Sequence, residues 1–74
     1  MILVIALTAQ QFKYYCQKKN LKPTEAKFVQ TVDDLRGYRD VKVVAVGNWW
    51  EQPARQDARI RAQEMGFSTE EVRL

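Results

Sequence analysis

Residues 41–47 of the sequence read Val-Lys-Val-Val-Ala-Val-Gly, and residues 1–7 read Met-Ile-Leu-Val-Ile-Ala-Leu. Both runs are almost continuously apolar and rich in β-branched side chains, whereas a strand with one solvent-exposed face alternates apolar and polar residues. Continuous runs indicate strands that are covered on both faces, which is the usual situation in a parallel sheet. The two runs therefore predict an α/β fold whose sheet lies between helices.

The segment between these two runs predicts a helix and a further strand. Thr8 and Gln11 have the spacing of a capping box, which begins a helix that ends near Lys19. Residues 27–32, Lys-Phe-Val-Gln-Thr-Val, contain strand-forming residues but are more polar, as suits a strand at the edge of a sheet. We therefore expect a β-α-β unit over the first half of the chain.

The second half predicts one longer helix and two short helical turns. Residues 33–37, with an Asp at the start and a Gly at the end, fit about one helical turn. A helix is expected from Pro53 to Met65, because Pro is favoured at the first helical position and a Gly follows. Residues 68–71, Ser-Thr-Glu-Glu, fit a second capping box and predict a terminal helical turn.

Connection lengths favour one strand order. A link of about eight residues joins neighbouring strands easily but hardly crosses an intervening strand, whereas a helical connection can. We therefore expect a single domain over residues 1–74, with a minimal three-layer, Rossmann-like architecture and a three-stranded parallel sheet in the order 1-3-2. The order 2-1-3, with the first strand in the centre, remains the alternative.

The composition excludes several kinds of site. The chain has 74 residues, one Cys and no His, so we expect no disulfide scaffold, zinc module or histidine-based catalysis. The apolar start is far shorter than the roughly 20 residues of a membrane span, and no Lys or Arg precedes it. We expect no cofactor, no metal ion and no membrane partner, and a cytoplasmic location, in the host cytoplasm if the protein is viral.

Two adjacent tryptophans are the most unusual feature of the sequence. Trp49 and Trp50 follow the second apolar strand, and ligands of open parallel sheets bind beyond the carboxyl ends of the strands. Two neighbouring indoles do not both fit readily into so small a core, and Trp is enriched at binding hot spots. We expect one indole to pack inward and the other to be exposed. The alternative is that both cover the end of the sheet.

The helix at 53–65 adds to this surface. Its small residues share one face, which places Ile60 on the opposite, exposed side. Arg55 and Arg59 lie one turn apart on a flank, where a solvated charged face is the alternative explanation. The sequence predicts a non-enzymatic protein-interaction module whose partner is a host factor or a second copy of the chain. The predicted protein-binding residues are Trp49, Trp50, Arg55, Arg59 and Ile60.

Nucleic-acid binding is the alternative function. Residues 1–31 contain five Lys and one Glu, so this third of the chain is its basic part. Lysines beside an aromatic ring suit phosphate contacts and base stacking. The residues for this role are Lys13, Tyr14, Lys18, Lys19 and Lys22.

An enzyme is the third option. It would use Asp33, Asp34 and Asn48 around a metal ion, although Asp at these positions also suits a helix cap. No Gly-rich phosphate-binding motif is present, and our prediction is that the protein is not an enzyme.

Residues 34–46, Asp-Leu-Arg-Gly-Tyr-Arg-Asp-Val-Lys-Val-Val-Ala-Val, resemble the stretch that leads into the Walker B strand of helicase and terminase-type ATPases. Gly47 and Asn48 stand where that family places its acidic pair, so the resemblance implies a strand without ATP hydrolysis. The predicted layout and the Leu-Arg-Gly turn also resemble small uncharacterised α/β proteins of actinobacterial phages. This second resemblance implies a viral accessory protein that acts by binding.

Overall fold

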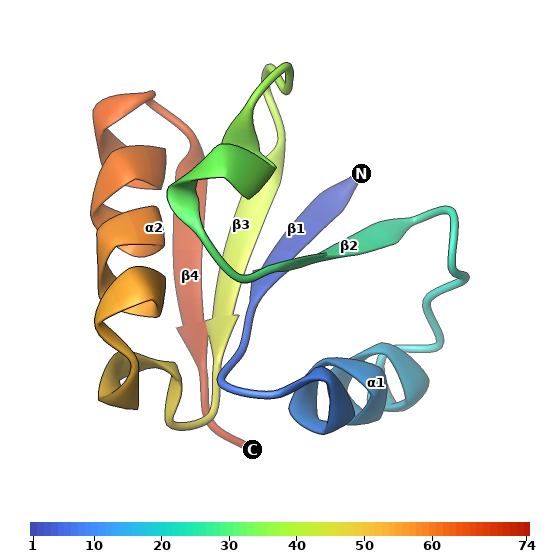
Figure 1. Ribbon diagram of the computed structural model, residues 1–74. Coiled ribbons are helices and arrows are strands. Elements are labelled where there is room, and N and C mark those ends of the chain that lie inside the picture. The colour runs from blue at the N-terminus through green and yellow to red at the C-terminus, as the bar shows by residue number, and fades with distance from the viewer.

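A four-stranded parallel sheet forms the middle of the computed structural model, which describes residues 1–74 (Figure 1). The strand order is β2-β1-β3-β4. The strands are β1 (Ile2–Ile5), β2 (Ala26–Val29), β3 (Lys42–Val46) and β4 (Ser68–Val72), and the helices are α1 (Ala9–Lys18) and α2 (Pro53–Glu64). Two short 3-10 turns, η1 (Val32–Leu35) and η2 (Trp49–Glu51), complete the chain. The predicted α/β class with a parallel sheet is confirmed.

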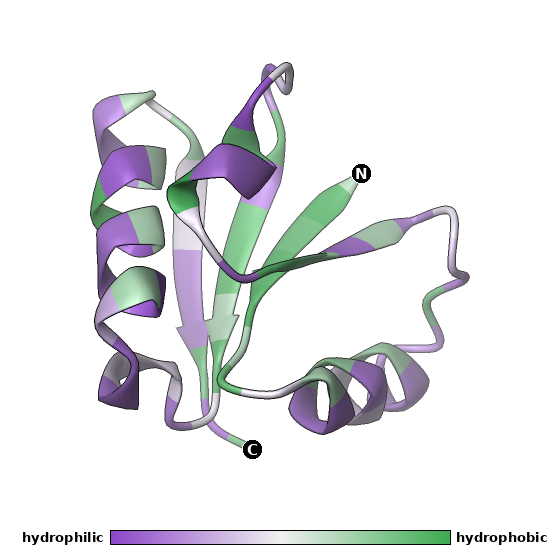
Figure 2. Cartoon of the chain, in the orientation of Figure 1, coloured by the Kyte–Doolittle hydropathy of each residue, from purple (hydrophilic) through white to green (hydrophobic).

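The central strands β1 and β3 are covered on both faces, as their sequences predict. Leu3, Val4 and Ile5 are each 0% exposed, and residues 43–46 are buried as well. The two strands pair in parallel, with Val4 opposite Val44. Figure 2 shows them as two adjacent hydrophobic strands, whereas β4 beside them is mostly polar.

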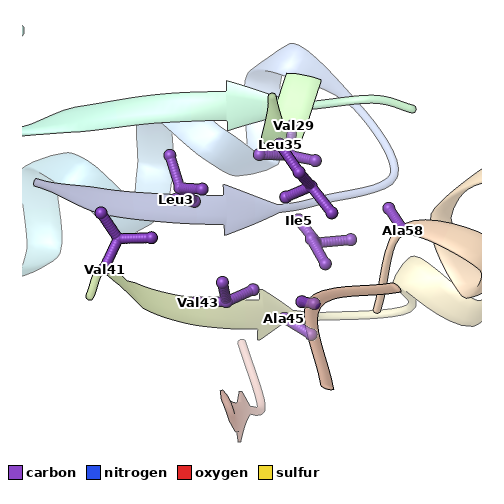
Figure 3. Close-up of a cluster of buried hydrophobic side chains, with 9 residues drawn as sticks. Leu3, Ile5, Val29, Leu35, Val41, Val43, Ala45 and Ala58 are labelled. Atoms are coloured by element: carbon purple, nitrogen blue, oxygen red, sulfur yellow. The ribbon is translucent and has the colours of Figure 1, made fainter. Parts of the chain in front are cut away.

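Buried side chains form one cluster on each face of the sheet, so the three-layer arrangement is confirmed. The cluster under α2 and η1 (Figure 3) consists of Leu3, Ile5, Val29, Leu35, Val41, Val43, Ala45, Ala58 and Ala62. The cluster under α1 consists of Val4, Ala6, Tyr15, Ala26, Val44 and Val46. Alternate residues of β1 and β3 supply both clusters, because successive side chains of a strand point to opposite faces.

Helix α2 lies close to the sheet through small residues. Ala58 and Ala62 are fully buried, whereas Ile60 is 54% exposed, as predicted. Pro53 begins the helix, and Gly66 follows its end with φ +80°, a conformation that Gly adopts readily. Neither helix of the structure combines the length and the apolar run that a bilayer crossing requires.

The prediction of three strands was wrong, because residues 68–72 form the strand β4 instead of a helical turn. β4 pairs with β3 along its length, with Val43 opposite Thr69. Hydrogen bonding to the open edge of β3 thus overrides the local capping-box pattern.

On β4, Glu70 Oε2 lies 2.7 Å from Lys42 Nζ, and this contact lowers the pKa of Glu70. Exposed charged side chains of this kind are typical of edge strands.

The favoured order 1-3-2 was also wrong, since β1 lies between β2 and β3 as in the alternative order. β2 ends at Val29 and not at residue 32, so the link to β3 runs over residues 30–41 and is long enough to cross β1. Leu35 of this link is 1% exposed and packs under α2. Connections that run toward one edge of the sheet lie on one of its faces, and the connection that runs toward the other edge lies on the opposite face. This follows because all of the crossovers have the same hand.

Candidate functional site at the carboxyl edge of the sheet

The strand order creates a switch point between β1 and β3. From β1 the chain passes through α1 to β2 on one side, whereas from β3 it passes through α2 to β4 on the other side. The two connections diverge at the carboxyl ends of the adjacent strands, and ligands of open α/β sheets bind in such crevices. This edge of the sheet is therefore where a functional site is expected.

A chain of amide hydrogen bonds spans the switch point. Gln11 Nε2 donates to Asn48 Oδ1 at 2.7 Å, and Asn48 Nδ2 donates to Glu51 Oε2 at 2.7 Å. The backbone N–H of Gln11 donates to Thr8 Oγ1 at 3.2 Å, so the predicted helix cap is present. The Gln11 side chain does not complete the capping box, because it is used to hold the loop after β3 against α1. Gln11 Oε1 is buried and accepts no hydrogen bond.

Gly47 packs closely against this network. Its φ is +61°, and a Cβ at this position would lie 3.1 Å from Gln11 Oε1 and 3.2 Å from Leu74 Cδ1. Only Gly allows so close an approach with this backbone conformation. Surface cavities of about 550 Å³ and 430 Å³ are both lined in part by Gln11 and Leu74.

The two indoles occupy different environments, as predicted. Trp49 is half-buried and packs against the cluster under α2, whereas Trp50 is 53% exposed. Their rings meet edge to face, with centroids 6.1 Å apart and an interplanar angle of 87°, a favourable geometry for aromatic pairs. Gln56 Nε2 donates to the carbonyl oxygen of Trp50. A cavity of about 370 Å³ adjoins both indoles.

Arg59 covers the inner indole. Its guanidinium carbon lies 5.7 Å from the ring centroid of Trp49, within range of a cation–π interaction. Arg59 Nε lies 3.4 Å from Glu71 Oε1, which is an ion-pair distance, but the two groups are not aligned as a hydrogen bond. The Arg59 side chain is 22% exposed. Arg59 of α2, which is itself paired with Glu71 of β4, thus covers the ring of Trp49 and holds it in position.

Arg55 is bound to the backbone of the sheet. Its Nε donates to the carbonyl oxygen of Ala6 at 2.8 Å, its Nη1 to Gln30 at 2.8 Å and its Nη2 to Leu7 at 3.1 Å. The guanidinium also lies 5.8 Å from the ring centroid of Phe28. These contacts use the donors of Arg55 to satisfy carbonyls beyond the ends of β1 and β2.

The structure therefore brings three of the five predicted protein-binding residues together. Trp49, Trp50 and Arg59 form one contiguous unit, which we name the tryptophan edge. Arg55 faces the backbone of β1 and β2, and Ile60 lies on the outer face of α2.

The residues of the nucleic-acid alternative lie on α1 and the loop after it. All five are exposed, and Tyr14 is 52% exposed. None of the four lysines takes part in an ion pair, and no Asp or Glu precedes Glu25 in the sequence. This segment is a basic surface on the opposite face of the sheet from α2. The residues concerned are Lys13, Tyr14, Lys18, Lys19 and Lys22.

The acidic residues of the metal-enzyme option form hydrogen bonds or ion pairs with separate partners. Asp34 Oδ2 accepts hydrogen bonds from the backbone N–H groups of Gln30 at 2.8 Å and Thr31 at 3.1 Å, and the bond from Gln30 is the main cause that lowers the pKa of Asp34. Asp33 lies 3.6 Å from Arg36 at the surface. No group of three or more Cys, Asp or Glu side chains is arranged to hold a metal ion.

The amide network was not predicted from the sequence. Its signals were the Gln at the third position of the helix after the first strand and the Asn after the second apolar strand. They become meaningful only when these two strands are known to be neighbours.

No protein-family model, curated protein or solved structure matches the chain.

Proposed function

We propose that this protein is a non-enzymatic interaction module that docks on another protein through the tryptophan edge. The observation that carries the proposal is the half-exposed indole of Trp50, which is held against a fixed base of Trp49 and Arg59. Trp and Arg are the residues that most often dominate the energy of protein interfaces. Arg55 supports the edge from within, and Ile60 is an outlying apolar contact on α2.

Preorganisation favours binding at this edge. The indole of Trp50 contacts Trp49, and its backbone carbonyl is bound by Gln56. An anchor that is already held in place loses less side-chain entropy when a partner binds. The contact surface of Trp50 is therefore available to a partner at a low entropic cost.

The cavity beside the indoles defines the chemistry of the partner. Its lining includes Trp50, Glu71, Val72 and Arg73. Glu71 is paired with Arg59 at 3.4 Å, whereas Arg73 is exposed and takes part in no ion pair. An apolar side chain next to Trp50, with a carboxylate next to Arg73, would match this lining. The resemblance to proteins of actinobacterial phages makes a host protein the first partner to test.

Affinity capture from a bacterial lysate with matched variants tests the proposal. Wild type and Tyr14→Ala should capture the same protein, whereas Trp50→Ala should lose it. Tyr14 is the matched control because it is an aromatic residue of almost the same exposure, lies on α1 and does not line the cavity beside the indoles. Equal capture by wild type and Trp50→Ala would refute the proposal. Light scattering at high concentration tests a second copy as the partner, and a strict monomer eliminates it.

Nucleic-acid binding through α1 is the second candidate, supported by the unpaired lysines around Tyr14. Binding through phosphate contacts weakens steeply as salt rises. A titration with single- and double-stranded DNA and RNA at low ionic strength tests it. Salt-sensitive binding that Tyr14→Ala weakens and Trp50→Ala preserves would favour this function, and no binding would eliminate it.

A further inference from the structure

A groove opens between α1, the loop that follows it and the edge strand β2. Its volume is about 430 Å³, within the roughly 300–1,000 Å³ that is typical of small-molecule sites. It lies on the α1 face of the sheet and shares no lining residue with the cavities at the carboxyl edge. The lining residues are Phe12, Lys13, Cys16, Gln17, Leu21, Lys22, Pro23, Ala26 and Phe28.

The walls of the groove are apolar. The rings of Phe12 and Phe28 are stacked, with centroids 5.3 Å apart and an interplanar angle of 16°. Cys16 and Leu21 are only partly buried against the cluster under α1. Burial raises the pKa of the Cys16 thiol, so this side chain is a neutral part of the wall at neutral pH. The groove thus leaves hydrocarbon surface open to water.

The charge of the lining has a single sign. Lys13 and Lys22 contribute to it, and neither forms an ion pair. The nearest acidic residue in the sequence is Glu25, whose carboxylate accepts a hydrogen bond from the backbone N–H of Lys22 at 2.9 Å. No Asp or Glu lines the groove. An occupant with a negative group would therefore meet two unpaired ammonium groups.

We propose that this groove binds a single-chain anionic amphiphile of the fatty-acid class. The hydrocarbon chain lies against the Phe12 and Phe28 rings, and the carboxylate lies between Lys13 and Lys22. Charge complementarity and the apolar walls both favour this occupant. Gln17 is the only uncharged polar side chain in the lining apart from the thiol, so a peptide would depend on the main-chain groups of the edge strand β2 for hydrogen bonds, whereas a hydrocarbon chain needs none. The site is independent of the tryptophan edge.

Titration with dodecanoate below its micelle concentration, followed by calorimetry and by NMR, tests the proposal. We expect saturable binding of one dodecanoate per chain. The double variant Lys13→Gln/Lys22→Gln should weaken it by about tenfold, and the matched variant Lys18→Gln/Lys19→Gln, which removes the same charge outside the lining, should leave it unchanged. Dodecanol should bind more weakly than dodecanoate to wild type and equally to both double variants.

Alkylation of Cys16 provides a readout at the groove itself. Saturating dodecanoate should slow the reaction of the thiol with iodoacetamide several-fold, since the chain covers the wall that contains it. Absence of saturable binding, equal loss in the two double variants, or an unprotected thiol would overturn the proposal. A dimer that dissociates in Phe28→Gln would also overturn it, because a second copy would then be the occupant.

Discussion

The Nε atom of Arg55 donates a hydrogen bond to the carbonyl oxygen of Ala6 at 2.8 Å, across 49 positions of the sequence. Two more donors of the same guanidinium reach the carbonyl oxygens of Leu7 and Gln30. One side chain of α2 therefore ties together the chain segments that leave β1 and β2. This contact holds the carboxyl edge of the sheet in place, and the tryptophan edge lies on the same side.

Replacement of Arg55 by Met should destabilise the fold while keeping the apolar stem. Three carbonyl oxygens would lose a charged donor, and hydrogen bonds to charged groups contribute about 1.5–3 kcal/mol each when they are well protected. Because Arg55 is partly exposed, we expect a loss of about 2 kcal/mol in the free energy of unfolding, measured by urea denaturation. The control Arg61→Met removes an exposed pair with Glu64 at 3.6 Å and should change stability by less than about 0.5 kcal/mol.

Replacement of Gly47 by Ala should destabilise the switch point more than the same change at Gly66. Both glycines have a positive φ, so both variants carry the left-handed strain of about 1–2 kcal/mol. Only at Gly47 does the new Cβ also crowd Gln11 and Leu74, since nothing lies within 4 Å of that position at Gly66. Thermal unfolding of both variants measures the difference. Equal losses would contradict the close contact between Gly47 and Gln11.

Asp34 should make the stability of the fold depend on acid pH. The hydrogen bond from the backbone N–H of Gln30 lowers the pKa of Asp34 in the fold, whereas an Asp in the unfolded chain has a pKa of about 3.9. The stabilisation is therefore present above about pH 4 and is lost as the pH falls through the lower folded value. Asp34→Asn replaces a charged acceptor by a neutral one, so it should be less stable at pH 7 by about 1 kcal/mol and should depend less on acid pH.

The matched control for this prediction is Asp33→Asn. The Asp33 side chain is 81% exposed and forms an ion pair with Arg36 at 3.6 Å. The urea denaturation midpoints of Asp33→Asn at pH 7 and at pH 3 should be nearly those of wild type. If Asp33→Asn removed the acid dependence and Asp34→Asn did not, the assignment of this dependence to Asp34 would be wrong.

The two tryptophans should differ in stability effect. Trp49→Ala removes an indole that packs under Arg59 and against the core, so we expect a loss of about 2–3 kcal/mol. Trp50→Ala removes a side chain of a residue that is 53% exposed, and its effect should be below about 1 kcal/mol. Urea denaturation compares the two variants. A larger loss in Trp50→Ala would mean that the outer indole is part of the core.

Much of the fold was predictable because its central strands have an unambiguous pattern. Apart from Lys42, the residues of β1 and β3 are apolar on both faces of the sheet, and a parallel sheet between helices buries both faces. The helix start at Thr8 and the stop at Gly66 follow from local hydrogen bonding and backbone preference, which short stretches of sequence encode.

The strand order and β4 were not predictable from the same local signals. β4 is polar, and its Glu70 and Glu71 gain partners only from Lys42 and Arg59 after folding. The strand order depended on where β2 ends, and sequence patterns locate the ends of elements poorly. The two errors share a cause, because pairing between distant segments decides both.

The candidate site was predictable as residue types but not as an arrangement. The sequence identified Trp49, Trp50 and the arginines by their character, and the inward and outward positions of the indoles followed from the small size of the core. It did not show that Arg55 would use its donors on strand carbonyls while Arg59 covers an indole. Both arginines lie on one flank of α2, so only the position of the sheet distinguishes them.

Acrylamide quenching of Trp50 fluorescence, with and without the captured partner, tests the central claim most directly. The variant Trp49→Phe leaves Trp50 as the only indole. We predict that the partner lowers the quenching of this half-exposed indole several-fold. Unchanged quenching of Trp50 in a complex shown to be fully formed would contradict the account, because the partner would then bind elsewhere.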